Sequence, residues 1–494
     1  MLVPMVVSLR FFILCSFFSL IISSSIAHTS FKPKALVLPL IKDVSSSTPQ
    51  YIIQINQRTP LVPVKLTLDL GGGYLWVNCE DGYTSSTSKP ARCGSAQCSL
   101  FGLYGCSGDK VCGHSASNTV TGLSTYGDIH EDVVSVQSTN GNNPGRVVSV
   151  PNFLFICGSN SLQNGLASGV KGMAGLGRTK VSLPSQFSSA FSFKRKFAIC
   201  LSSSTGTNGV IFFGEGPYNL NIDVSKVLTF TPLITNHVNT ISGFLGEPSV
   251  EYFIGVKSIR VSGKRVPLNN TLLSIHKNGF GGTKISTVNP YTVLETTIYK
   301  AVADAFVKAV GAQKVAPMAP FGTCFATKDI GFSRMGPDVP SIDLILQNKE
   351  VVWNIIGANS MVQFNDVICL GFVDAGSNPS TSKVGFVKVN PYTVLETTIY
   401  KAEVEAFVKA VGAQKVALVA PFGTCFATKD IGFSRMGPDV PSIDLVLQNK
   451  EVVWNTIGAN SMVQLNDVIC LGFVDAGSNP STSKVGFVKV GCTQ

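Results

Sequence analysis

One acidic residue, Asp69, stands where a carboxylate could be catalytic. The apolar alternation of residues 62–68 predicts a buried strand that ends on this acid. The glycines at 71–73 allow a tight turn, and residues 74–77 are typical of a following strand. Asp69 is therefore either a catalytic carboxylate or an acid that caps the turn by accepting backbone N–H bonds.

Short apolar runs between turn residues predict the strands that must position Asp69, and helical periodicity is scarce. A second glycine-rich turn, at 172–178, lacks the spacing of a phosphate-binding loop. A short helix is expected from Ser182, and an amphipathic helix is expected from Glu295 to Val310, ended by Gly311. The expected strands include 35–41, 51–55, 132–136, 153–157, 197–201, 210–214 and 252–256, with a hairpin at 259–264.

The bulk composition predicts a folded, mostly β protein. The chain has 494 residues, 45% of them hydrophobic and 14% charged, which is enough for two or more domains with real cores. The formal net charge is +10, but the cations are scattered, which argues against a nucleic-acid surface. A basic protein on the secretory route would tend to bind acidic polysaccharide or an acidic protein, although the charge could equally serve solubility alone.

Residues 1–27 have the pattern of a secretory signal peptide. Arg10 precedes the apolar stretch 11–22, and small residues lead to cleavage after Ala27. That stretch is short for a membrane span, and no later run of about 18 apolar residues occurs. We expect a mature protein that is soluble, extracytoplasmic and not membrane-bound.

Thirteen cysteines are present, and twelve remain once Cys15 leaves with the signal peptide, so disulfides are expected. Metal binding is the weaker alternative, because the cysteine spacings do not suit zinc and the five histidines do not cluster. No metal or cofactor is expected. The expected disulfides are Cys79–Cys157, Cys200–Cys492, Cys324–Cys369 and Cys425–Cys470, and the pairing of Cys93, Cys98, Cys106 and Cys112 is left open. Asn269 begins a glycosylation sequon.

The chain repeats itself near its C-terminus. Residues 289–389 recur as 390–490 with an offset of 101 residues and eight substitutions, which indicates a tandem duplication rather than a solenoid. We therefore divide the mature chain into a first half at 28–195, a second half at 196–389, and a duplicate with its tail at 390–494. Residues 196–288 have two candidate partners, of which only one can complete the second half.

Five stretches carry a resemblance to a known plant family. They are Gln57-Arg58-Thr59-Pro60-Leu61, Asp69-Leu70-Gly71-Gly72, and the segments 187–198, 247–253 and 289–295. Through them, residues 36–389 resemble the basic 7S globulin and extracellular dermal glycoprotein group, which includes inhibitors of microbial xylanases and xyloglucan endoglucanases. The resemblance implies a bilobal pepsin-like fold, cell-wall residence, and little or no proteolysis. The internal repeat adds a tandem-duplicated C-terminal half-lobe to this fold.

The same resemblance assigns roles around Asp69. In a pepsin-like lobe, Met173-Ala174-Gly175 would be the strand that crosses the loop carrying the acid. Ser286 occupies the place of the second catalytic aspartate, and Val387 takes that place in the duplicate. Pepsin-type hydrolysis needs two close carboxylates that share a proton, so Asp69 alone would be vestigial. Ser286 has no histidine near it in sequence and is not an evident nucleophile.

In the endoglucanase inhibitors of this group, arginines from loops of the second lobe reach the catalytic carboxylates of the target. Arg334 matches one such position, and Arg435 is its duplicate. A guanidinium forks onto carboxylates and mimics developing positive charge. The alternative is a solvated surface arginine. A second family arginine is missing near Pro379-Ser380, and roughly twenty residues of strand that the family has after Ser382 are absent, which predicts an unpaired sheet edge.

The leading hypothesis is a secreted, catalytically inactive homologue of the aspartic proteases that inhibits microbial endoglycanases. The expected partner is a microbial glycoside hydrolase, with cell-wall polysaccharide or a small peptide as further partners. One alternative is an aspartic endopeptidase with residual activity. Another is a storage or peptide-binding globulin of the 7S type.

Overall fold

The computed structural model describes residues 31–102, 104–141, 143–201, 208–218, 230–239, 248–333, 336–347, 351–377, 393–395, 397–417, 424–434, 437–446, 453–456, 461–465, 467–475 and 485–487. Apart from residues 31–33, the described residues belong to one compact unit within 34–494. The signal peptide predicted at 1–27 lies outside the described residues. Within the described part of the chain, no helix is both long and apolar enough to cross a lipid bilayer.

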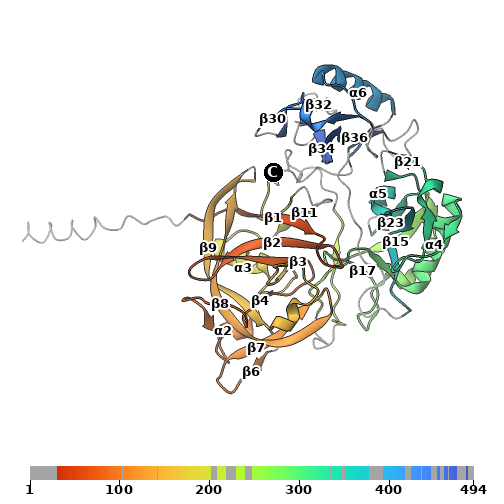
Figure 1. Cartoon of the computed structure of the whole chain (residues 1–494). Coiled ribbons are helices and arrows are strands. Elements are labelled where there is room, and N and C mark those ends of the chain that lie inside the picture. The colour runs from red at the N-terminus through yellow and green to blue at the C-terminus, as the bar shows by residue number, and fades with distance from the viewer. Residues whose placement is uncertain are drawn as a thin grey trace, which may run out of the picture. The chain divides into compact units, whose positions relative to one another are not determined.

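A 12-stranded sheet organises the first half of the chain (Figure 1). The strand order is β11-β12-β1-β2-β3-β10-β4-β9-β8-β7-β6, and β5 pairs with β8 beside this path. The strands are β1 (Ala35–Asp43), β2 (Gln50–Gln57), β3 (Val62–Asp69), β4 (Leu75–Asn78), β5 (Lys89–Pro90), β6 (Gly105–Cys106), β7 (Cys112–Asn118), β8 (Leu123–Thr139), β9 (Pro144–Gly158), β10 (Gly172–Gly175), β11 (Phe197–Cys200) and β12 (Gly209–Gly214).

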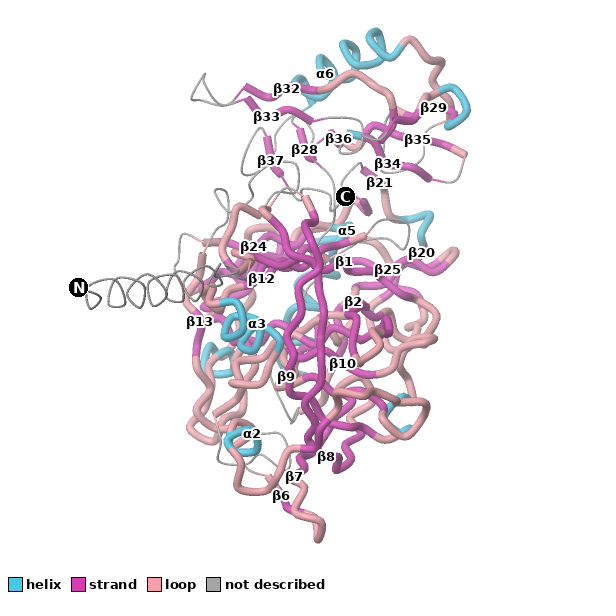
Figure 2. Tube along the Cα trace, turned by 90° about the vertical axis from the view of Figure 1, so that its left-hand side faces the viewer, coloured by secondary structure: helices cyan, strands magenta, loops and turns pink. Residues whose placement is uncertain are grey.

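The strands predicted at 132–136 and 153–157 are parts of much longer elements. They lie within β8 and β9, two antiparallel strands that run side by side over most of their length (Figure 2). The helices of this half are α2 (Ala96–Ser99), the 3-10 turn η1 (Asn160–Gln163) and α3 (Leu183–Phe191). Ser182 is the N-cap residue of α3, as its position before the apolar run predicts.

Residues 197–214 were expected to begin the second half, but the structure places their strands in the sheet of the first half. Strand β12 pairs with β1, from Ala35↔Gly214 to Leu40↔Gly209, and β11 pairs with β12. These two strands therefore extend the sheet of the first half beyond residue 195. The physical reason is burial: Ile211 and Phe213 pack in the same apolar core as Leu36 and Leu38. Sequence order alone gives no sign that a late strand pairs with the first one.

Several smaller sheets build the second half. Its strands are β13 (Leu233–Ile234), β14 (Tyr252–Ile254), β15 (Val256–Val261), β16 (Lys264–Arg265), β17 (Thr283–Ile285), β18 (Thr292–Leu294), β19 (Lys314–Val315), β20 (Cys324–Ala326), β21 (Phe332–Ser333), β22 (Gly336–Pro337), β23 (Ile342–Leu346), β24 (Val352–Ile355), β25 (Met361–Phe364), β26 (Val367–Leu370) and β27 (Phe372–Asp374). Its helices are η3 (Asn270–Leu273), α4 (Thr296–Val310), η4 (Thr327–Asp329) and α5 (Gly357–Ser360).

Helix α4 forms as the sequence predicts. The Glu295 side chain caps it by accepting hydrogen bonds from the backbone N–H groups of Thr297 and Ile298. Gly311 ends it in the left-handed conformation, with φ of 74°. The buried face of α4 includes Val302 and Phe306.

The first copy of the repeat completes the second half. Strand β15 pairs with β23 of this copy, from Val256↔Leu346 to Val261↔Ile342. One apolar core joins residues from β15, α4 and β23, including Ile259, Val302 and Leu344. The question of which copy completes this half, which the sequence leaves open, is answered by this shared core.

The second copy repeats the same elements around a smaller core of its own. That core includes Val404, Phe407, Phe426 and Ile469. The elements are β28 (Thr393–Leu395), α6 (Thr397–Val411), β29 (Cys425–Ala427), η5 (Thr428–Asp430), β30 (Phe433–Ser434), β31 (Gly437–Pro438), β32 (Ile443–Val446), β33 (Val453–Thr456), β34 (Met462–Leu465), β35 (Val468–Leu471), β36 (Phe473–Asp475) and β37 (Val485–Phe487).

Strand β32 differs from its counterpart β23 in its neighbours. Among the described residues β32 pairs only with β33, whereas β23 lies between β15 and β24. Two of the eight substitutions fit this difference, because the fully buried Val302 and Ile355 of the first copy become Glu403 and Thr456 in the second. Polar residues at these places indicate that the second copy is not built to pack against a strand like β15.

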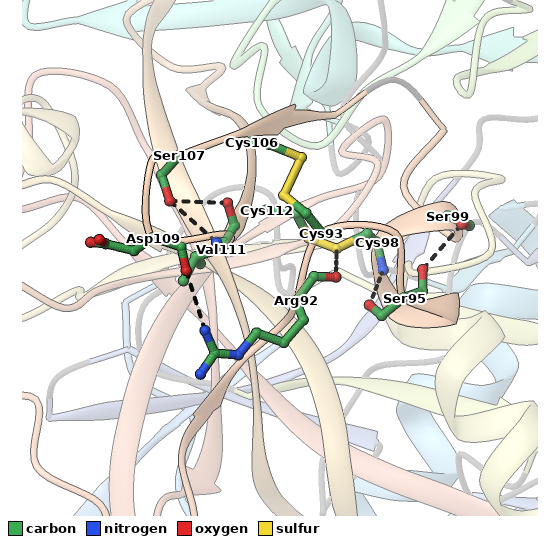
Figure 3. Close-up of a disulfide and its surroundings, with 10 residues drawn as sticks. All are labelled: Arg92, Cys93, Ser95, Cys98, Ser99, Cys106, Ser107, Asp109, Val111 and Cys112. Carbon is green, nitrogen blue, oxygen red and sulfur yellow. Dashed lines mark hydrogen bonds between the residues drawn. A yellow bond between two sulfur atoms is a disulfide. The ribbon is translucent and has the colours of Figure 1, made fainter.

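Five disulfides lie among the described residues. Three of them join Cys79 to Cys157, Cys324 to Cys369 and Cys425 to Cys470, which are pairs named from the sequence. The four cysteines whose pairing the sequence did not decide form the disulfides Cys93–Cys106 and Cys98–Cys112. These two disulfides cross-link the surface segment around α2 (Figure 3). Cys200 is also disulfide-bonded, and its expected partner Cys492 lies outside the described residues.

Candidate functional site

Asp69 ends β3 and points into a closed environment. Only 5% of its surface is exposed. Its Oδ1 accepts a hydrogen bond of 2.9 Å from the backbone N–H of Gly71, and its Oδ2 accepts one of 2.7 Å from the hydroxyl of Thr119. The structure therefore has the turn-capping contact that was one of the two interpretations of this acid, and Thr119, between β7 and β8, covers its other oxygen.

The glycines around Asp69 are needed for close approach. A Cβ atom at position 72 would lie 3.0 Å from Asp69 Oδ2 and 3.0 Å from the Cα of Gly175. Strand β10 passes directly beside this turn, pairing in parallel with β3 so that Gly175 lies opposite Asp69. The expected crossing of the acid-bearing loop by Met173-Ala174-Gly175 is thus confirmed.

Burial raises the pKa of the Asp69 carboxyl above its ordinary value. The hydrogen bonds from Thr119 and Gly71 act in the opposite direction because they stabilise the carboxylate. Two charged neighbours from the second half have smaller effects: Glu251 raises the pKa and Lys284 lowers it. The result is an acid whose ionised form is disfavoured by its surroundings.

Thr287 connects the second half of the chain to the loop that carries Asp69. Its hydroxyl donates to the carbonyl of Leu68 over 2.8 Å and accepts from the backbone N–H of Leu70 over 2.9 Å. These groups flank Asp69 on both sides. The preceding residue, Ser286, turns its hydroxyl to the backbone N–H groups of Val288 and Asn289, at 3.2 and 3.3 Å.

A buried ion pair lies next to this loop. Lys284 Nζ is 2.6 Å from Glu251 Oε1, and the two side chains are 10% and 14% exposed. Glu251 also approaches the turn closely, because a Cβ at position 71 would lie 3.2 Å from its Cγ. This pair was not predicted from the sequence. The only signal was a lysine inside a short strand, two residues before Ser286.

Arg334 and Arg435 lie outside the described residues, so the structure does not place their side chains. The strands on either side of each are described. Strands β21 and β22 pair antiparallel through Phe332↔Pro337, and β30 and β31 pair through Phe433↔Pro438. Each arginine therefore belongs by sequence to the tip of a short hairpin.

Asn269, the predicted glycosylation residue, is exposed and caps η3. Its side chain accepts hydrogen bonds from the backbone N–H and the hydroxyl of Thr271, at 3.1 and 2.8 Å. Among the described residues, no group of three or more His, Cys, Asp or Glu side chains is arranged to hold a metal ion.

A separate pocket of about 500 Å³ lies beside the Cys79–Cys157 disulfide. Its lining includes Asp128 and His130. The Nδ1 atom of His130 is 3.0 Å from the hydroxyl of Ser88. Burial lowers the pKa of His130 below its usual value, although the nearby carboxylate of Asp128 opposes this effect. A neutral imidazole beside hydroxyls can hydrogen-bond a polar ligand, and sequence reasoning did not identify this pocket.

Comparison with known families matches both halves of the chain. Residues 51–215 match the family described as xylanase inhibitor N-terminal. The family described as xylanase inhibitor C-terminal matches twice, at residues 251–386 and 383–488, so that each match includes most of one copy of the repeat.

Curated relatives give the same result. A protein named "Probable aspartic proteinase GIP2" from Nicotiana benthamiana is 56% identical over 399 residues, covering 77% of this chain and 90% of the relative. Gamma conglutin 1 of Prunus dulcis is 44% identical over 386 residues, covering 74% and 85% of the two chains. Basic 7S globulin of Glycine max is 36% identical over 387 residues, covering 74% and 86%.

Solved structures support the fold. The crystal structure of edgp has a TM-score of 0.69 and 54% identity, covering 73% of this chain and 91% of that one. Conglutin gamma from lupine seeds has a TM-score of 0.62 and 35% identity, covering 72% and 90%. Conglutins, basic 7S globulins and xylanase-inhibitor domains together indicate a non-catalytic pepsin-like homologue. The chain belongs to the xylanase-inhibitor family of pepsin-like proteins, together with the gamma conglutins and basic 7S globulins.

Proposed function

We propose that this protein is a secreted, catalytically inactive pepsin-like protein that binds and inhibits microbial endoglycanases, either xylanases or xyloglucan endoglucanases. The observation that carries the proposal is the match of xylanase-inhibitor domains along both halves of the chain. The secretory pattern of residues 1–27 and the disulfides fit a protein of the cell wall.

The surroundings of Asp69 support the absence of proteolysis. An aspartic protease divides two roles between two carboxylates: one deprotonates water while the other protonates the substrate carbonyl. The contacts of Thr287 with Leu68 and Leu70 fit the view that Ser286 stands where the second acid would be. Both oxygens of Asp69 are engaged in hydrogen bonds.

Glu251 does not supply the missing acid. It is the carboxylate from the second half whose charge acts on Asp69, but its Oε1 is bound to Lys284 at 2.6 Å. That oxygen therefore already has a cationic partner and is not free to form a carboxylate pair with Asp69. An ion pair, rather than a second free carboxylate, therefore lies beside Asp69.

The inhibitory contact is proposed to come from the hairpins that carry Arg334 and Arg435. A guanidinium matches a carboxylate bidentately, and glycoside hydrolases hold two carboxylates in the active site. Each hairpin also has an exposed phenylalanine two residues before its arginine. These residues are Phe332 in the first hairpin and Phe433 in the second. Aromatic and arginine residues are the types that most often dominate the energy of an interface.

The experiment is a titration of purified fungal xylanases and xyloglucan endoglucanases with the secreted protein. The variant Arg334→Ala/Arg435→Ala is compared with Lys308→Ala/Lys409→Ala, which removes two exposed cations at equivalent positions of α4 and α6. Saturable inhibition that is lost only in the arginine variant supports the proposal. Absence of inhibition by the folded wild-type protein against the whole panel would overturn it.

A second candidate is favoured by the conglutin and basic 7S globulin relatives, which allow a storage or peptide-binding role. Saturable binding of a small cysteine-rich peptide, without inhibition of any glycanase, would support that role. Residual endopeptidase activity is the third candidate. A peptide-cleavage assay at acid pH tests it, and we expect no cleavage above background.

A further inference from the structure

We infer that this chain is bivalent: it carries two equivalent docking hairpins, β21–β22 and β30–β31, and each binds one glycoside hydrolase molecule. The inference rests on the proposed inhibitory function and concerns the number of target molecules bound per chain. It is specific to this chain because the segment 289–389 is present twice.

The described backbone at the base of each hairpin has the same hydrogen bonds. In the first copy, the backbone N–H of Ile330 donates a hydrogen bond of 3.2 Å to the carbonyl of Thr327, and the N–H of Asp338 donates one of 2.7 Å to the carbonyl of Gly331. In the second copy, the equivalent bonds are Ile431 to Thr428 over 3.3 Å and Asp439 to Gly432 over 2.7 Å. The 3-10 turns before the hairpins, η4 and η5, also agree, with φ of −69° and −68° at their N-cap residues.

Each hairpin is anchored to a core of its own copy. Ile330 is 5% exposed and packs in the core of the second half, while Ile431 is 6% exposed and packs with Phe426 and Ile469 of the second copy. The disulfide behind each hairpin is equivalent, because Cys324–Cys369 and Cys425–Cys470 both have Cα atoms 4.0 Å apart. The second hairpin therefore has its own support and does not depend on β15.

None of the eight substitutions between the copies lies in the hairpins or in the residues that flank them. Residues 319–344 and 420–445 are identical, whereas two of the eight differences replace core residues by polar ones, Val302 by Glu403 and Ile355 by Thr456. These changes fit a copy that has adapted to the lack of a β15 partner. The sequence of the segment that would meet a target has not changed.

Each hairpin presents one aromatic anchor. Phe332 is 42% exposed and Phe433 is 53% exposed. An exposed phenylalanine gains most when it is buried in a pocket of a partner, and the glycan-binding cleft of a glycoside hydrolase is such a concave site. Because the anchors are the same residue type in the same hairpin register, one target fits both sites.

The test measures stoichiometry with a glycanase that the wild-type protein inhibits. Isothermal titration and native mass spectrometry of the full-length chain should give two enzyme molecules per chain. Phe332→Ala and Phe433→Ala should each weaken one of the two sites by about 30-fold or more, the range of an interface hot spot, and leave the other unchanged. The variant Lys308→Ala/Lys409→Ala should keep two sites.

A wild-type chain that saturates at one enzyme molecule would overturn bivalence while leaving the inhibitor proposal intact. Two sites that are both insensitive to Phe332→Asp and Phe433→Asp would overturn the assignment to these hairpins. No binding by any glycanase would instead be a failure of the proposed function. Because both phenylalanines are exposed, these variants should fold, and circular dichroism verifies it.

Discussion

The hydroxyl of Thr287 should hold the Asp69 loop in place, and Thr287→Val removes it with little change in side-chain shape. In the wild type, this hydroxyl bonds to Leu68 O at 2.8 Å and to Leu70 N at 2.9 Å. Thr287 and the two backbone groups are buried, so no water replaces the lost partner easily. The variant leaves one backbone donor and one backbone acceptor unsatisfied.

The expected loss of stability follows from these two unsatisfied backbone groups. A buried polar group left without its partner costs about 1–3 kcal/mol, so two such groups predict about 2–6 kcal/mol. No cavity cost is added, because valine fills nearly the same volume as threonine. The control is Thr327→Val, whose hydroxyl makes an exposed contact of 3.3 Å with Asn365 O and should cost only a few tenths of a kcal/mol.

Two measurements test this prediction. Denaturant unfolding followed by tryptophan fluorescence gives the free energy of unfolding of both variants. Hydrogen exchange gives the local effect, since protection of the Leu70 amide should fall about 30-fold or more for a local loss of 2 kcal/mol. A change below 0.5 kcal/mol (roughly the scatter of surface substitutions) with unchanged protection at Leu70 would refute the structural role of this hydroxyl.

Three further predictions concern the charged groups near this loop. The pKa of Asp69 in the folded protein is raised above 3.8, so its contribution to stability is full below pH 3.8 and is lost as the pH rises through the folded-state pKa. The variant Asp69→Asn can keep the contact with Thr119. It should therefore match the wild type at pH 3 and unfold at a higher denaturant concentration than the wild type at pH 7. Lys284→Met should cost about 3–5 kcal/mol because it leaves Glu251 buried and unpaired, and Lys284→Met/Glu251→Gln should recover most of that loss in the same unfolding assay. Ser286→Asp restores a second carboxylate but should still give no peptide cleavage at acid pH, because Asp69 is 5% exposed and both of its oxygens accept hydrogen bonds. Measurable turnover would show instead that the absence of the second acid alone prevents catalysis.

Local patterns predicted much of the structure near Asp69. The alternation before this acid and the glycines after it gave β3, the turn and the start of β4 because strand periodicity and turn chemistry are local properties. The apolar spacing and the terminal glycine gave α4 in the same way. The crossing of β10 beside Asp69 came from a family resemblance, not from local pattern.

What sequence reasoning missed depends on long-range pairing. The pairing of β12 with β1 joins residues about 175 positions apart, a separation that no window of sequence captures. The contact of Thr119 with Asp69 and the pairing of Lys284 with Glu251 likewise need the folded sheet order. The sequence could not decide between the two copies of the repeat because nearly identical segments have nearly identical propensities.

We propose that the chain inhibits a glycanase rather than cleaving peptides. The most direct test of this proposal is the titration of a fungal xylanase and a xyloglucan endoglucanase with the purified protein, alongside Arg334→Ala/Arg435→Ala. We expect saturable inhibition by the wild type that is lost in the double variant. Inhibition that survives the double variant would contradict the assigned site, and a folded wild-type protein that inhibits no glycanase would contradict the function itself.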